Sequence, residues 1–166
     1  MIVLVSGDRH WSDKEFIKNA LRGIGTVSLG REESIEAIFE GGATGADALS
    51  HEVGDELGIP VFELKANWAK EGNAAGPIRN AQMLKFGHID LVLAFHDDIE
   101  HSKGTRDMID KAIRAKVRVI LYSHKGTFDI PVQCLQCSRY FLIDDGEAII
   151  GEPKLCSEKC ALDFSS

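Results

Sequence analysis

A chain of 166 residues, of which 44% are hydrophobic, is long enough for one full hydrophobic core and a small appendage, but not for two ordinary domains. Its formal net charge of −7 gives no general attraction to nucleic acid or to an anionic membrane. The opening apolar run is too short for a signal peptide and no stretch approaches a membrane span, so we expect a cytoplasmic protein without a membrane partner.

Short apolar runs alternate with amphipathic segments between residues 1 and 122. The expected strands are Ile2–Val5, Ala37–Phe39, Val61–Leu64, Leu91–Phe95 and Val117–Tyr122. Consecutive parallel strands need right-handed helical crossovers, which cover both faces of the sheet. The alternation therefore predicts an α/β fold with a doubly wound parallel sheet.

Helix-start signals follow the first four strands. Ser12 and Glu15 have the spacing of a capping box, so the first helix is expected to begin at Ser12. Thr44 is expected to cap the second helix, and Pro77 suits the first turn of the third. The fourth helix is expected to follow Thr105.

Three glycine-centred segments lie where an apolar strand runs into a helix. They are Ser6-Gly7-Asp8-Arg9, Gly41-Gly42-Ala43-Thr44-Gly45-Ala46-Asp47 and Gly104-Thr105-Arg106-Asp107. The carboxyl ends of parallel strands face one crevice, so backbone N–H groups at the helix N-termini would converge there. We therefore predict an anion site, most simply a phosphate site.

The glycine patterns of two common nucleotide-binding classes are absent. The first turn has a single glycine, so the G-x-G-x-x-G of dinucleotide dehydrogenases is missing. Gly25 and Gly30 have the spacing of a P-loop, but Arg31 follows where Lys and Ser/Thr are required. Both observations argue against hydride transfer and NTP hydrolysis.

Several polar and aromatic residues are candidates for the site. Arg79 follows a long connection and is placed to bind a phosphate through two parallel hydrogen bonds. For Asp47, completion of a capping box with Thr44 and contact with a ligand are equally supported. Trp11 and Trp68 are candidates for stacking on a base, although packing is the favoured interpretation for both. The histidines have no spacing that indicates a metal site.

All the cysteines lie near the end of the chain, and their spacing is that of a two-knuckle zinc site. The predicted ligands are Cys134, Cys137, Cys156 and Cys160. Four thiolates would close the coordination shell, so the zinc would be structural; two disulfides or free thiols are the alternative. We place a linker at residues 123–131 and a zinc-binding module at residues 132–166, with a hairpin formed by 140–143 and 148–150. Because the module is acidic, we expect it to contact protein or form a homo-oligomer rather than bind nucleic acid.

The motifs between residues 1 and 122 together resemble the SLOG superfamily, in particular its YspA/YpsA-related branch of bacterial and phage proteins. The resemblance rests on the Ser-Gly-Asp-Arg opening, the Gly-Gly-Ala-x-Gly-Ala-Asp turn, the segment from Ala75 to Met83 and the Gly104 turn. It implies a Rossmann-like domain that binds a nucleotide or a nucleotide-derived ligand such as a ribose-phosphate, NAD or ADP-ribose-like compound. With the neighbours of its motif residues included, the predicted site is Gly7, Asp8, Arg9, Gly42, Ala43, Gly45, Asp47, Arg79, Asn80, Gly104 and Thr105.

A catalytic alternative comes from superfamily members similar to the Lonely Guy enzymes, which cleave the N-glycosidic bond of nucleoside monophosphates. Their Arg-Lys-x-x-Met segment corresponds here to Arg79-Asn80-Ala81-Gln82-Met83, which lacks the lysine. Their glutamate position corresponds to Met108, which cannot transfer a proton or stabilise a cation. Binding is therefore the favoured function, an N-glycosidase or phosphoribohydrolase is the alternative, and an interaction module with a vestigial crevice is the third reading.

Overall fold

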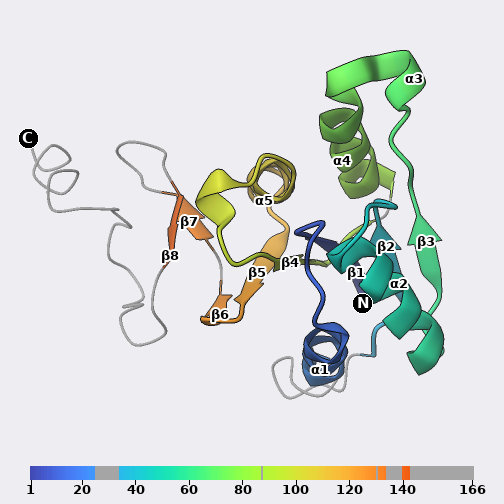
Figure 1. Cartoon of the computed structure of the whole chain (residues 1–166), viewed down its shortest axis with the longest axis vertical. Coiled ribbons are helices and arrows are strands. Elements are labelled where there is room, and N and C mark those ends of the chain that lie inside the picture. Colours follow the sequence, from blue (N-terminus) through green and yellow to red (C-terminus); the bar gives the residue numbers. More distant parts are fainter. Residues whose placement is uncertain (25–33, 87, 130, 134–139, 143–166) are drawn as a thin grey trace, which may run out of the picture.

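The computed structural model describes residues 1–24, 34–86, 88–129, 131–133 and 140–142 (Figure 1). The main sheet has the strand order β3-β2-β1-β4-β5-β6. Its strands are β1 (Ile2–Gly7), β2 (Ala37–Glu40), β3 (Val61–Glu63), β4 (Leu91–Phe95), β5 (Arg118–Ser123) and β6 (Gly126–Asp129). All pairs from β3 to β5 are parallel, and β6 is antiparallel to β5. The expected α/β fold with a mostly parallel sheet is confirmed.

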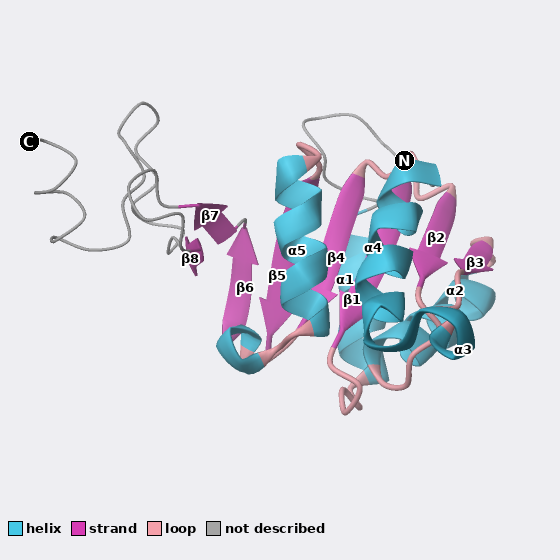
Figure 2. Ribbon diagram, turned by 90° about the horizontal axis from the view of Figure 1, so that it is seen from above, coloured by secondary structure: helices cyan, strands magenta, loops and turns pink. Residues whose placement is uncertain are grey.

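Helices connect the parallel strands and cover both faces of the sheet (Figure 2). They are α1 (Lys14–Ile24), α2 (Ala46–Leu57), α3 (Trp68–Glu71), α4 (Ala75–Phe86) and α5 (Gly104–Arg114), with short 3₁₀ turns at Gly72–Ala74 and Ile99–His101. Helices α1 and α2 lie on one face, and α4 and α5 lie on the other. The connection expected as a long loop before Arg79 is therefore largely helical.

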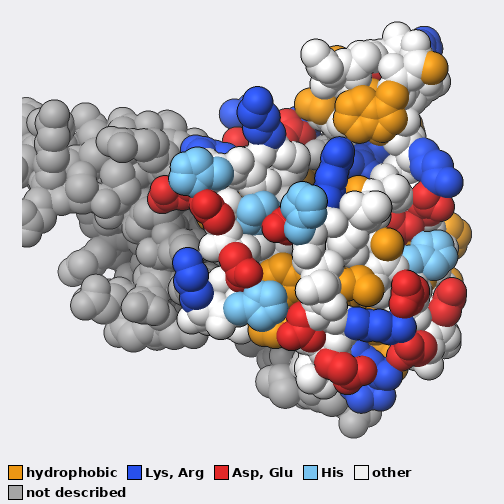
Figure 3. Space-filling view, in the orientation of Figure 1, with side chains coloured by type: hydrophobic (Ala, Val, Ile, Leu, Met, Phe, Trp, Pro, Cys, Tyr) orange, Lys and Arg blue, Asp and Glu red, His pale blue; other side chains and the backbone are white. Residues whose placement is uncertain are grey.

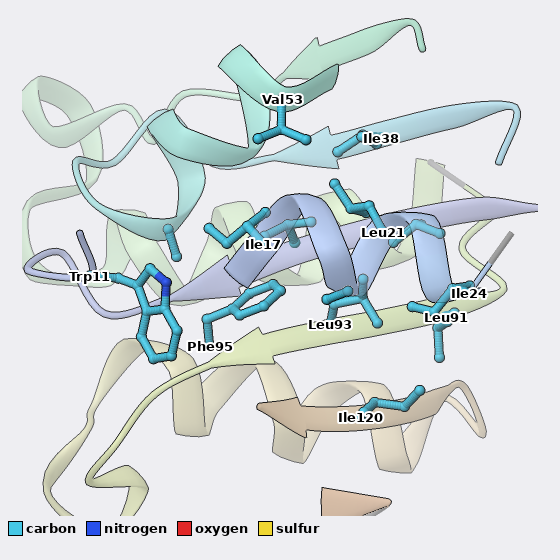
Figure 4. Packing of buried hydrophobic residues seen from close by; sticks show 14 residues of the cluster. Trp11, Ile17, Leu21, Ile24, Ile38, Val53, Leu91, Leu93, Phe95 and Ile120 are labelled. Atoms are coloured by element: carbon cyan, nitrogen blue, oxygen red, sulfur yellow. The ribbon is translucent and has the colours of Figure 1, made fainter. Parts of the chain in front are cut away.

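Alternating strand residues build a separate hydrophobic core on each face. Val3 and Val5 pack with α1 and α2, whereas Leu4 between them packs with α4 and α5. Successive side chains of a strand point to opposite faces, and so a continuous apolar run can fill two cores. In Figure 4, Ile17 and Leu21 of α1 lie over the side chains of the central strands.

Two of the predicted helix caps are wrong. Asp13, not Ser12, caps α1, because its Oδ1 accepts a hydrogen bond from the Phe16 N–H at 2.9 Å. The N-cap residue of α2 is Gly45, and no side chain caps this helix. Thr44 instead donates its hydroxyl hydrogen bond to the Arg9 carbonyl, at 3.1 Å. The partner of each capping side chain depends on the backbone conformation at that position, and the spacing of residue types does not determine that conformation.

The sheet also continues past the expected end of the main domain. Strand β6 lies within the segment 123–131 that was expected as a linker, and Leu121 pairs there with Phe128. Farther on, β7 (Pro131–Gln133) pairs antiparallel with β8 (Tyr140–Leu142). The expected hairpin arm at 148–150 and the cysteines lie outside the described residues. Within the described residues, no helix combines the length and the apolar character needed to cross a membrane.

Candidate functional site

A cleft of about 370 Å³ lies beyond the carboxyl ends of β1, β2 and β3. This volume falls in the range of small-molecule sites, about 300–1,000 Å³. Figure 3 shows basic side chains gathered in the hollow beneath the α3 segment. The lining comes from the turns after these strands and from α4, as Arg9, Gly41, Gly42, Ala43, Thr44, Ala66, Trp68 and Arg79.

Arg79 brings a buried positive charge to this cleft from the second turn of α4. Its side chain is only 13% exposed, and its Nε and Nη1 atoms are buried without a hydrogen-bond partner. Burial lowers the pKa of its guanidinium, while Asp47 and Glu40 oppose that shift. Buried donors without acceptors are costly, and this side chain lines a cleft in which an anion would compensate its charge.

Asp47 braces the glycine-rich turn from inside the protein. Its Oδ2 accepts hydrogen bonds from the N–H groups of Gly41 at 3.2 Å and Ala43 at 3.3 Å, and lies 3.9 Å from Nη1 of Arg79. Burial raises the pKa of Asp47 to about 6, although Arg79 and the two N–H groups act in the opposite direction. The capping box expected with Thr44 does not form, because the carboxylate binds the turn instead.

The glycines of this turn allow a backbone path that other residues resist. Gly42 and Gly45 have φ values of 69° and 72°, in the left-handed region. At Gly45 a Cβ atom would also overlap the backbone of Asp8 and Arg9. The Ala46 N–H donates to the Asp8 carbonyl at 3.1 Å, so the turns after β1 and β2 lie against each other. This contact positions Arg9 beside the Gly41–Thr44 turn.

The third glycine turn does not line the cleft. Thr105 is 3% exposed, and Asn80 is equally buried. The Asn80 Nδ2 donates to Asp107 Oδ2 at 2.9 Å and to the Gly104 carbonyl at 3.4 Å. Asn80 therefore joins α4 to the first turn of α5, and Thr105 is buried in that turn. Gly7 and Asp8 also lie outside the lining, where their backbones connect the end of β1 to α2 and β4.

Met108, at the glutamate position of the Lonely Guy enzymes, is fully buried in the core. It packs there with Leu4 and Met83, away from the residues that line the cleft. A glutamate at this position would place a carboxylate in the core, where an unpaired charge is strongly unfavourable. Asp47 is the predicted carboxylate that lies next to the cleft.

The two tryptophans have different environments. Trp11 is 5% exposed and packs edge-to-face on Phe95, which confirms the packing interpretation. Trp68 lines the cleft and is 53% exposed, so its ring surface is accessible to a ligand. Ala66 also lines the cleft, although no motif in the sequence indicates it. A close approach of Arg79 to Gly41 has no local sequence signal, because it depends on how α4 packs beside β2.

A group of potential metal ligands was also missed. Glu40, His51 and Glu63 each offer one donor atom, and these atoms all lie within 4.8 Å of one another. They come from β2, α2 and β3, so their separation in the chain hides the cluster. Their proximity follows from the pairing of β2 with β3 and from the packing of α2 on the sheet.

Comparisons with known proteins agree with this architecture. The family model described as "YspA, cpYpsA-related SLOG family" matches residues 1–70. The matched part includes Arg9, the glycine-rich turn and Trp68, but it ends before Arg79. Among curated proteins, the Gene 61 protein of Mycobacterium phage D29 is 30% identical over 128 aligned residues. That match covers 74% of this chain and 97% of the phage protein.

Proposed function

Because the chain belongs to the YspA, cpYpsA-related SLOG family, we propose that its cleft binds a nucleotide or nucleotide-derived ligand through a phosphate group. The observation that carries this proposal is the buried guanidinium of Arg79, whose Nε and Nη1 have no acceptor within the described part of the protein. Arg79 lines the cleft, so a phosphate bound there would compensate the charge of this guanidinium.

Arg9 adds a second positive charge to the same cleft. It lies close enough to Arg79 to lower the pKa of that guanidinium, in addition to the larger effect of burial. Two guanidinium groups that repel each other are both stabilised by an anion between them. The pair therefore favours a phosphate or a diphosphate over a neutral sugar.

Trp68 and the small turn residues suit the remainder of a nucleotide. Trp68 is half exposed at the cleft and offers a planar apolar surface on which a base or ribose can pack. Gly42 and Ala43 present little side-chain bulk at the cleft, so a ribose-phosphate can pack closely against them, although the N–H groups of this turn already donate to Glu40 and Asp47. We accordingly assign an ADP-ribose-like or nucleoside monophosphate ligand to this cleft.

Cleavage of an N-glycosidic bond is the alternative function. Asp47 is the carboxylate that favours it, because it is buried beside Arg79 and has a pKa of about 6. A carboxyl group with such a pKa can exchange a proton near neutral pH. However, its Oδ2 accepts two backbone hydrogen bonds that hold the glycine-rich turn. We therefore propose binding without efficient turnover.

Calorimetry with AMP, ADP-ribose and adenosine tests the proposal. The phosphate-bearing ligands should bind more tightly than adenosine, by about 1.5–3 kcal/mol per charged hydrogen bond. Arg79→Ala should remove this preference, whereas Arg106→Ala, which alters an exposed arginine of the third turn, should leave it unchanged. Equal affinities for AMP and adenosine would contradict the phosphate site. Rapid release of base from AMP, abolished by Asp47→Asn, would establish the enzymatic alternative.

For the C-terminal part of the chain we propose a structural zinc ion bound by Cys134, Cys137, Cys156 and Cys160. The support is their spacing, with two residues between the first pair and three between the second. Because this module is short and acidic, we further propose that it serves protein contact or self-association after zinc has folded it.

A further inference from the structure

Glu40 and Glu63 occupy directly paired positions on neighbouring parallel strands. They are register partners at the carboxyl ends of β2 and β3. Like charges placed opposite each other in a sheet repel, and the repulsion is stronger where water is excluded. The Glu40 side chain is only 2% exposed and that of Glu63 is 31% exposed. A counter-charge at this position would therefore stabilise the edge of the sheet.

The groups that face these carboxylates provide only partial compensation. Glu40 accepts a hydrogen bond from the Gly42 N–H at 2.6 Å, and its Oε1 lies 3.0 Å from Nδ1 of His51. Glu63 lies 3.2 Å from Nζ of Lys65, but that lysine side chain is 75% exposed and can swing into solvent. A cation held between the imidazole and both carboxylates would contact all three groups at once.

The chemistry of the donor set favours one class of cation. Nδ1 of His51 and Oε1 of Glu40 lie 3.0 Å apart, at hydrogen-bond distance, and an ion bound by both groups would replace that hydrogen bond. Glu63 is partly exposed and can adjust its rotamer to complete the set. An imidazole with two carboxylates suits Mn²⁺, Fe²⁺ or Zn²⁺ better than the oxygen-seeking Mg²⁺ or Ca²⁺.

We propose that Glu40, His51 and Glu63 form a binding site for a divalent first-row transition-metal ion at the wall of the anion cleft. Each ligand comes from a different element, and His51 and Glu63 leave the site open to solvent. With three protein ligands, the remaining coordination positions are free for water or for an oxygen of a bound anion.

Gly42 connects this metal site to the cleft. Its N–H binds Glu40, a Cβ atom at this position would overlap Glu63, and the residue itself lines the cleft. A divalent ion here would add positive charge at Gly42, in addition to the charge of Arg79. It would therefore favour a ligand with a diphosphate. The preference for a diphosphate rests on the proposed nucleotide function, whereas metal binding by Glu40, His51 and Glu63 does not.

Titration of the full-length protein with Mn²⁺ alone, followed by the EPR signal of the free ion, tests the site. Mn²⁺ prefers carboxylate and imidazole ligands, so the cysteines should not compete for it. We expect about one bound ion, and at least about tenfold weaker binding in His51→Ala and in Glu63→Gln. Both side chains are partly exposed, so the variants should stay folded, which circular dichroism checks.

His101→Ala is the matched control, because His101 makes a similar Nδ1 contact to Asp98, at 2.8 Å, outside the cluster. Absence of Mn²⁺ binding by the wild-type protein, or equal weakening in His101→Ala, would overturn the proposal. ADP-ribose calorimetry with and without Mn²⁺ then tests the coupling. Tighter ADP-ribose binding with Mn²⁺ in the wild type but not in His51→Ala supports it, and unchanged affinity contradicts it. Failure of ADP-ribose to bind at all would refute the nucleotide function while leaving the metal result intact.

Discussion

The guanidinium group of Arg79 lies against the backbone of Gly41, in the space that a Cβ atom on residue 41 would occupy. This contact holds the arginine at the cleft without a strong ion pair, since Asp47 Oδ2 is 3.9 Å from Nη1. The absence of a side chain at Gly41 therefore allows α4 to place the Arg79 guanidinium against the turn after β2. In this position Arg79 lines the cleft.

Gly41→Ala should weaken AMP and ADP-ribose binding by about tenfold or more, because the added methyl group displaces the guanidinium and loses a charged hydrogen bond. Adenosine binding should change much less. Gly23→Ala is the control, since a Cβ atom there would have nothing within 4 Å. Calorimetry of the three ligands gives the comparison, and wild-type affinity for ADP-ribose in Gly41→Ala would contradict the role of this contact.

Gly45→Ala and Gly58→Ala should differ in their effect on stability. Gly58 has φ 68° and ψ 26°, in the left-handed helical region that costs a Cβ-bearing residue about 1–2 kcal/mol. Gly45 has φ 72° and ψ −125°, which lies outside that region and is even less favourable for a residue with a Cβ atom. At Gly58 there is open space, so that cost should be the whole effect. At Gly45 the Cβ atom would also overlap the backbone of Asp8 and Arg9, so the loss should exceed about 2 kcal/mol. Urea unfolding measures both values, and equal losses would show that the turns after β1 and β2 are not held together as described.

His124→Gln should destabilise the protein more at about pH 5.5 than at about pH 9. The hydrogen bond to Asp97, at 2.8 Å, is the main cause of the raised pKa of His124, and Asp13 adds to it. A raised folded-state pKa means that the stabilisation is full below the ordinary imidazole value and is lost as the pH rises through the folded value. The effect should be small, because both side chains are nearly half exposed.

The pKa of the Asp97 carboxylate sets the lowest pH at which the His124–Asp97 ion pair stabilises the protein. Hydrogen bonds from the His124 ring, the His124 N–H and Ser123 lower its pKa to about 2. Its contribution is therefore present above the ordinary carboxyl value and is lost as the pH falls towards about 2. Ser123→Ala removes a neutral donor, so its cost should not vary between the two pH values. Thermal unfolding of both variants at the two pH values measures these losses of stability. A loss in His124→Gln that does not vary with pH would rule out the charged pair.

Protein purified without chelator should contain about one equivalent of zinc bound by the C-terminal cysteines, in addition to any zinc held by Glu40, His51 and Glu63. Cys134→Ser and Cys156→Ser should each reduce it strongly, because loss of either thiolate opens the coordination shell. The main sheet should remain folded, since its core lies in residues 3–121. Metal analysis measures the zinc content, and circular dichroism shows whether the main sheet is folded. Less than about half an equivalent of zinc in the wild type would contradict the zinc site.

The parallel strands and most of the helices between them could be predicted from the sequence, whereas α3 could not. Continuous apolar runs such as Leu91–Phe95 indicate strands buried on both faces, and helical spacing indicates the crossovers. The part of the site at the Gly41–Asp47 turn could also be predicted, because small residues at a strand end allow a ligand to approach the backbone closely. These features depend on neighbours in the chain, and so the local pattern was enough to predict them.

Which of the candidate residues lie in contact depends on how the elements pack. Asn80 and Arg79 are adjacent in sequence, yet Asn80 joins α4 to α5 while Arg79 faces the cleft. Consecutive residues of a helix point in directions about 100° apart, so the orientation of α4 on the sheet sets both roles. Glu40, His51 and Glu63 likewise come together through the β2–β3 register and the placement of α2. Such contacts depend on distances across the fold, which residue spacing along the chain does not encode.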